Sequence, residues 1–200
     1  MARTADDQRR VDLLERILDY VMENGLSDLS LRPLAEAVDS SPRVLLYYFG
    51  SKERLVTEVL VAAGARQRTI FDGLPRDATS YRETVSAAWR AMSAPEHEAV
   101  FRLFFEVYGL SLQDPKRFPG FLQRAVDVWL DYLQPSALRE GYSKADARAI
   151  ATVILAGYRG FLLDLCTTRD RRRIDRAVDI WIAALDRIPA PKELPRAKRT

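Results

Sequence analysis

A short stretch, residues 41–52, carries side chains of the types that bind nucleic acids. If the stretch is helical, Arg43 and Tyr47 fall on the side opposite Leu45 and Phe49. Guanidinium groups bind guanine edges and phosphates, and hydroxyl groups bind phosphates. DNA binding is therefore predicted for this stretch and the helix before it. The candidate contact residues are Arg32, Ser41, Arg43, Val44, Tyr47, Tyr48 and Lys52.

The sequence contains few candidate catalytic residues. His97 lies in the first turn of an expected helix between Glu96 and Glu98, and the chain has no second histidine to complete a metal site. The single cysteine, Cys166, has the character of a core residue. The sequence contains neither a phosphate-binding glycine loop nor a serine-nucleophile motif. We expect no enzymatic activity, no metal and no cofactor.

Two short helices and a tight turn would position the candidate DNA-binding side chains. Ser30 is placed to cap the first helix. Ser41 can cap the second, and Pro42 fills its first position, where a missing N–H costs nothing. Only Asp39-Ser40 separates them, so the pattern predicts a helix-turn-helix, with an ordinary helical corner as the alternative. The inward face of the second helix is expected to hold Leu45, Leu46 and Phe49.

The run SPRVLLYYFGSKE, residues 41–53, resembles the signature of TetR-type transcriptional repressors, roughly S-x-G-T-L-Y-x-H-F-x-S-K-E. Asp39 replaces the usual turn glycine, which aspartate tolerates because it enters the left-handed region at modest cost. Leu46 replaces a tyrosine that commonly touches the DNA backbone, so Tyr47 or Tyr48 would take over that contact. The strongest matches are Ser41, Leu45, Phe49, Ser51, Lys52 and Glu53.

This resemblance implies an all-α, TetR-like fold, with an N-terminal three-helix helix-turn-helix domain and a C-terminal helical bundle. It also implies a homodimeric repressor that is released from a palindromic operator by a small-molecule effector. Few charges are expected to point into the bundle, the exceptions being Glu106, Arg159 and Asp164, so the effector should be largely apolar. The expected cavity walls are Trp89, Met92, Phe104, Phe105, Tyr108, Trp129 and Phe161.

The whole chain is basic, but the N-terminal part that contains the predicted DNA-binding stretch is not. The chain has 200 residues, 48% of them hydrophobic, and a pI of about 9.1. Residues 1–60 nevertheless carry 8 basic and 11 acidic side chains, a net charge of −3, whereas residues 169–200 carry a net charge of +5. DNA binding must therefore depend on the local placement of a few cations. No apolar leader is visible at the N-terminus, and a cytoplasmic location is expected.

The rest of the chain divides into helical patterns. A helix with Val11, Leu14, Leu18 and Val21 should complete the first domain. A long helix, residues 51–71, is expected to cross a domain boundary near residue 60, and Pro135 is expected to end a later helix. The predicted domains are a helix-turn-helix domain over residues 1–60, a ligand-binding and dimerisation domain over residues 61–188, and a disordered basic tail over residues 189–200.

The last two helices are predicted to form a dimer interface. Residues 143–166 are apolar nearly all round, and such a helix needs a partner on every side. The final helix, residues 174–188, has apolar residues at spacings of four, three and four. The candidate interface residues are Ile154, Gly157, Gly160, Val178, Trp181 and Leu185.

Three functions remain open from the sequence. The first is a ligand-responsive, dimeric DNA-binding repressor. The second is a ligand-independent helix-turn-helix regulator that is controlled by protein contacts. The third is a helical adaptor that does not bind DNA. The outward face with Arg43, Tyr47, Tyr48 and Lys52 favours the first two.

Overall fold

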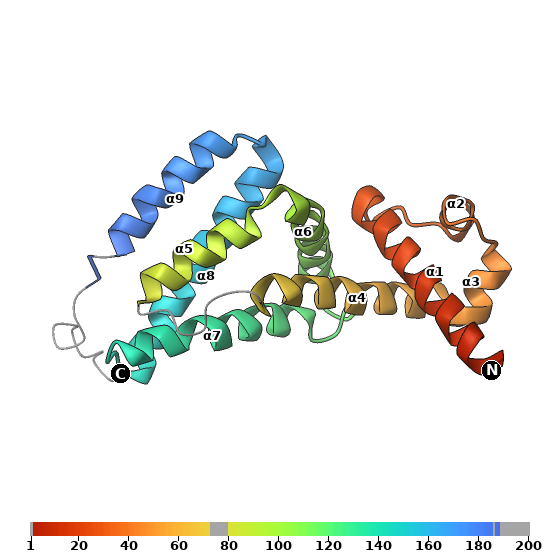
Figure 1. Ribbon diagram of the computed structural model, residues 1–200, viewed down its shortest axis with the longest axis horizontal. Helices are drawn as coiled ribbons and strands as arrows, with labels where there is room; N and C mark the ends of the chain where they lie inside the picture. Colours follow the sequence, from red (N-terminus) through yellow and green to blue (C-terminus); the bar gives the residue numbers. More distant parts are fainter. Residues whose placement is uncertain (1, 73–79, 186, 189–200) are drawn as a thin grey trace. The chain divides into compact units, whose positions relative to one another are not determined.

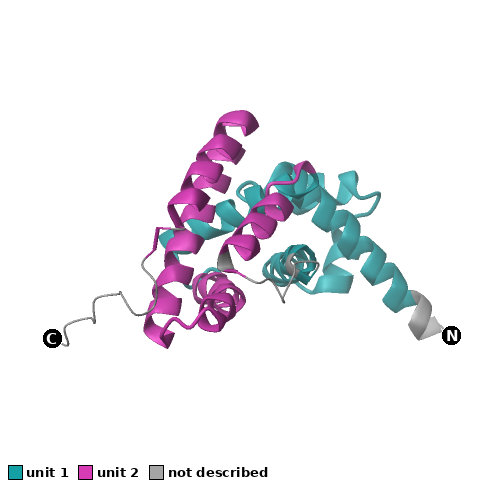
Figure 2. Cartoon of the chain, turned by 60° about the vertical axis from the view of Figure 1, so that its left-hand side comes forward, with its two compact units in different colours: residues 1–72, 96–119 teal, residues 73–95, 120–200 magenta. Residues whose placement is uncertain are grey.

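The computed structural model describes residues 2–72, 80–185 and 187–188, and within these ranges the backbone forms helices and short turns with no strand (Figure 1). The all-α fold class is thus confirmed for the described part of the chain. The chain forms two compact units (Figure 2). Unit 1 contains residues 1–72 and 96–119, and unit 2 contains residues 73–95 and 120–200.

Unit 1 is built around α1 and carries the helix-turn-helix. The inward face of α1 is centred on Ile17, with Leu13, Leu18 and Val21 also buried, whereas Val11 is exposed. The predicted stripe was therefore wrong at Val11, because the buried face of α1 is turned away from this residue. The helices of unit 1 are α1 (Ala2–Asn24), α2 (Leu31–Ala37), α3 (Pro42–Phe49), α4 (Lys52–Asp72) and α6 (Glu98–Gln113).

The boundary of unit 1 does not follow the predicted division near residue 60. The whole of α4 belongs to unit 1, and α6 packs on α1 and α4 in the same unit. Arg66, in the second half of α4, contributes to the packing of α4 on α1. It pairs with two acidic residues of α1, Asp19 at 2.7 Å and Glu15 at 2.6 Å. These contacts tie the second half of α4 to the first helix.

Unit 2 is organised around Tyr158 on α8. The Tyr158 side chain is fully buried, burial raises the pKa of its hydroxyl well above the usual range, and the hydroxyl donates to the Val85 carbonyl at 2.8 Å. Its ring lies 5.5 Å from that of Trp129 and 5.6 Å from that of Trp181, between centroids. The helices of unit 2 are α5 (Tyr81–Met92), α7 (Phe121–Arg139), α8 (Lys144–Thr168) and α9 (Arg171–Leu185), and the short 3-10 helix η1 (Pro95–His97) starts at the end of its first segment.

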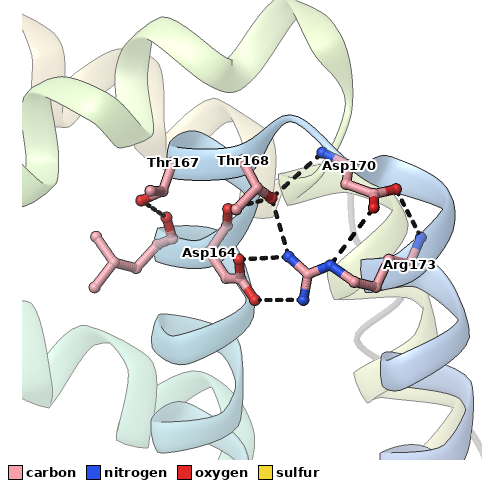
Figure 3. A network of polar contacts seen from close by, with 6 residues as sticks. Asp164, Thr167, Thr168, Asp170 and Arg173 are labelled. Carbon is pink, nitrogen blue, oxygen red and sulfur yellow. Dashed lines mark hydrogen bonds and ion pairs between the residues drawn. The ribbon is translucent and has the colours of Figure 1, made fainter.

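A polar network fixes the turn between α8 and α9 (Figure 3). Both terminal nitrogens of Arg173 donate to the Asp164 carboxylate, at 2.9 and 2.7 Å, and Arg173 also reaches Thr168 and Asp170. Hydrogen bonds from Arg173 hold the pKa of Asp164 below its usual value. Such bidentate pairs have a defined geometry, and this one links the start of α9 to the end of α8.

Two serines cap helices of unit 2, and one predicted stop signal was wrong. Ser80 accepts from the Glu83 N–H at 3.2 Å, and Ser143 accepts from the Asp146 N–H at 3.1 Å, as expected for N-caps. Pro135 does not end its helix, because α7 continues to Arg139. Pro135 is exposed, so the carbonyl that loses its donor can bind water. The predicted tail, residues 189–200, lies outside the described residues.

Candidate DNA-binding interface

The turn between α2 and α3 is held by local hydrogen bonds. Asp39 adopts a φ of 49°, the left-handed conformation expected at this position. The Ser40 N–H donates to the Ala35 carbonyl at 2.8 Å, and the Ser41 hydroxyl accepts from the Val44 N–H at 3.3 Å. The capping prediction for Ser41 is confirmed. Ser30 occupies the N-cap of α2, but its side chain makes no capping hydrogen bond.

The two faces of α3 have opposite environments. Leu45 and Phe49 are buried, which confirms the inward prediction for these two residues. Leu46 is 42% exposed, so its predicted inward position is wrong; it lies at the edge of the buried face of this short helix. Arg43 and Val44 are exposed, and Tyr47 is 73% exposed. The outward face of α3 is therefore unoccupied by other parts of unit 1.

The first turns of α1 hold the end of α3. The Arg10 guanidinium lies 5.2 Å from the centre of the Phe49 ring, donates to the Tyr48 carbonyl and pairs with Glu58. The Tyr48 hydroxyl donates to Asp6 at 2.8 Å, and this bond raises the pKa of Tyr48. Sequence reasoning missed both contacts, because they leave no local signal. Tyr48 is 42 positions from Asp6 and 38 positions from Arg10. Arg10 is thus a structural residue, and the Tyr48 hydroxyl already has a partner.

Two exposed cations lie on the helices before and after α3. Arg32 is exposed in the first turn of α2, and Lys52 is exposed at the start of α4. The Ser51 hydroxyl accepts from the Arg54 N–H at 3.2 Å and caps α4. Hydrogen bonds from its own backbone N–H and from Ser51 lower the pKa of the neighbouring Glu53 carboxyl. Helices α2, α3 and the start of α4 therefore carry exposed guanidinium, phenol and ammonium donors, groups that suit phosphates and base edges.

The predicted cavity residues are distributed over both units. On α6 in unit 1, the Phe104 ring lies 5.4 Å from Phe105 and 5.8 Å from Tyr108. In unit 2, Trp89, Met92 and Trp129 are buried, and Phe161 is half-buried 6.1 Å from Trp89. Within unit 2, Trp181 joins this cluster, since its ring lies 5.4 Å from Phe161.

The three charges expected to point into the bundle all have polar partners. Glu106 accepts hydrogen bonds from the chain segment after α1, and Asp164 is paired with Arg173. Arg159 donates to the Ala125 carbonyl at 2.9 Å.

Most of the predicted dimer residues lie inside unit 2, and this part of the prediction is corrected. Ile154, Val178 and Leu185 are buried among the helices of the unit. Trp181 packs on Gly157, where an added Cβ would lie 2.3 Å from its ring. The seam between α8 and α9 is thus an internal contact of one protomer. Gly160 alone of the six faces open space, with no atom within 4 Å of a Cβ built there.

The exposed side of α8 carries a different apolar stripe. Val153 and Leu163 are 50% and 51% exposed, and Ile180 on α9 is 64% exposed. Ala149, Val153, Ala156, Gly160 and Leu163 are spaced by four, three, four and three residues, a helix-packing pattern. Among the described helices, α8 is the one with the length and apolar composition of a membrane span, although one side of it is buried in unit 2.

Comparison with known proteins identifies the fold. No family model and no curated protein matches the sequence. A structure from Rhodococcus sp., assigned to the TetR family of transcriptional regulators, aligns with a TM-score of 0.72 over 90% of this chain and 97% of that one, at 18% identity. The chain has the TetR-family fold. The helix-turn-helix inferred from residues 41–53 agrees with this fold, and α2 and α3 form it in unit 1.

Two further structures with the TetR fold were solved with bound molecules. The multidrug binding protein EbrR, in complex with imidazole, aligns with a TM-score of 0.62 over 92% of both chains, at 18% identity. BioQ, in complex with its double-stranded DNA operator, aligns with a TM-score of 0.52 over 88% of this chain and 98% of that one, at 22% identity.

Proposed function

We propose that the protein is a cytoplasmic, homodimeric DNA-binding transcriptional repressor that a small, largely apolar effector releases from a palindromic operator. The observation that carries the proposal is the division of α3, which anchors Leu45 and Phe49 inside unit 1 and exposes Arg43, Val44 and Tyr47. An anchored helix with an open basic and aromatic face suits the major groove. The operator complex of BioQ supports the same use of the fold.

Selection of bound DNA from a random pool tests this proposal directly. A dimer with two-fold symmetry should select a palindrome. The centres of its two half-sites should be separated by one helical turn of DNA, about 34–36 Å, or by a multiple of that distance. Recovery of no enriched sequence would favour the adaptor function, and an unpaired half-site would contradict the dimeric regulator.

Arg43→Ala and Arg32→Ala should each relax the preference at one base position. An arginine that binds guanine bidentately contributes about 1–3 kcal/mol of discrimination. Binding to the selected operator and to single-base variants should be measured at fixed salt concentration. An equal loss on all sequences would instead identify the arginine as a phosphate contact.

Lys52→Ala should weaken binding to all DNA sequences to a similar extent. A lysine that neutralises one phosphate contributes about one unit to the slope of log K against log salt concentration. The slope should therefore fall by about one while the selected sequence stays the same. Glu53→Gln, next to Lys52, serves as a control, since removing a negative charge should not reduce the slope. An unchanged slope for Lys52→Ala would refute its role.

The dimer is proposed to form through the outward faces of α8 and α9. Val153, Gly160, Leu163 and Ile180 supply exposed apolar or small surface there, and a second copy of the chain is the simplest cover. This surface replaces the buried residues that were predicted from the sequence.

The small-molecule effector has an alternative, which is regulation without any ligand. If an effector binds the DNA-released state about 100-fold better, it can lower operator affinity by up to about 2.7 kcal/mol. The aromatic cluster in unit 2 contains Trp89, Trp129 and Trp181, so an effector bound there should change tryptophan fluorescence. EbrR with imidazole is a ligand-bound example of the fold. The close packing of these rings also fits the ligand-independent regulator. That alternative gains support if apolar aromatic compounds change neither fluorescence nor operator binding.

A further inference from the structure

Two charged side chains on α6 bind the end of α1 and the segment that leads into α2. Arg102 donates from Nη2 to the Met22 carbonyl at 2.7 Å and to the Glu23 carbonyl at 3.4 Å. Glu106, one turn later, accepts from the Leu26 N–H at 2.9 and 3.0 Å through its two oxygens. We call Arg102 and Glu106 the α6 clasp.

Glu106 also binds Ser27 twice. Its Oε1 accepts from the Ser27 N–H and from the Ser27 hydroxyl, each at 2.7 Å. Gly25 has a φ of 80°, and a Cβ on it would lie 2.9 Å from Glu106 Oε2. The carboxylate therefore sits directly against the backbone where the chain turns from α1 toward the helix-turn-helix.

The clasp uses backbone groups that the end of a helix leaves without partners. The last carbonyls of a helix lack intrahelical donors, and the N–H groups of the following turn lack helical acceptors. A cation and an anion spaced four residues apart on α6 satisfy both kinds of group, and such charge-assisted bonds are stronger than neutral ones. The position of α6 thus becomes linked to the segment that starts α2.

The N-terminal half of α1 contacts α3. Arg10 touches Phe49 and Tyr48, about 18 Å from Met22 along the helix axis at 1.5 Å per residue. A continuous helix is a stiff element, so a movement of α6 would act on the helix-turn-helix through α1 and through the Leu26–Ser27 segment.

We infer that Glu106 and Arg102 are positioning residues for DNA binding, and that they couple the state of α6 to the state of the helix-turn-helix. This inference rests on the proposed DNA-binding function. Coupling is reciprocal, so DNA bound at α3 must change α6 if a change in α6 is to alter DNA binding. The link lies wholly within unit 1.

The test is hydrogen exchange of the α6 backbone, residues 98–113, in the full-length protein with and without the selected operator. In the wild type, operator binding should change the exchange rate of these amides by about threefold or more. Glu106→Gln should abolish that response, because the amide replaces an acceptor and the charge is lost. Glu96→Gln removes the same charge from an exposed position of unit 1 and should keep the response.

Ser27→Ala provides a milder variant in case Glu106→Gln unfolds unit 1. Ser27 is exposed and loses only the hydroxyl bond, so the protein should fold and the α6 response should be reduced. Wild-type protein that binds operator with no change in α6 exchange, or variants with a full response, would overturn the inference. Failure of the wild type to select any DNA would instead overturn the proposed function.

Discussion

Gly160→Trp should convert the protein into a monomer and weaken operator binding by about 100-fold or more. Gly160 faces open space on α8, between the exposed Val153 and Leu163, so an indole there does not disturb the protomer. It would instead block close approach of a second copy to the proposed interface. Two linked half-site contacts gain roughly 100-fold or more over a single contact, and a monomer loses that gain.

Sedimentation at micromolar concentration and operator titration should be measured on the same samples. Leu138→Trp is a suitable control, because it adds similar bulk to an exposed position of α7 in the same unit. The control should remain dimeric with unchanged affinity. A Gly160→Trp dimer with full operator affinity would contradict the proposed interface, and wild-type protein that sediments as a stable monomer would contradict the dimer itself.

Gly157→Ala should destabilise the protein, although alanine is the better helix former. A Cβ at this position lies 2.3 Å from Trp181 Cζ2 and 2.6 Å from Cε2, so the rigid ring has to move. Tyr158 and Phe161 flank the ring and restrict that movement. Overpacking of this kind typically costs about 1–3 kcal/mol after relaxation, which exceeds the gain of about 1 kcal/mol from replacing a helical glycine.

The measurement is the free energy of unfolding from denaturant titration. Gly64→Ala is a matched control, since Gly64 lies within α4 and a Cβ there meets no atom within 4 Å. This control should be neutral or more stable by up to about 1 kcal/mol. If Gly157→Ala is as stable as the control, the Trp181 ring does not pack on α8 as described.

Local signals in the sequence were sufficient for the helix-turn-helix. Ser41, Pro42 and Asp39 act on the backbone within a few residues of themselves, so their effects on the turn and on α3 can be derived without the rest of the chain. The division of α3 into a buried and an exposed side also follows from helical periodicity. The exception is Leu46, which lies at the margin of a face only two turns long, where neighbouring helices decide burial.

The sequence alone determined the helical fold class, the Ser41 cap and the outward position of Arg43 and Tyr47, because these depend on neighbours in the chain. Tertiary structure decided which side of α8 is internal. That helix is apolar nearly all round, so periodicity could not distinguish Gly157, which lies against Trp181, from Gly160, which faces open space. It also decided the role of Glu106, whose partners are about 80 residues away in the chain. No local pattern encodes such a contact, because it exists only once α6 packs beside the end of α1.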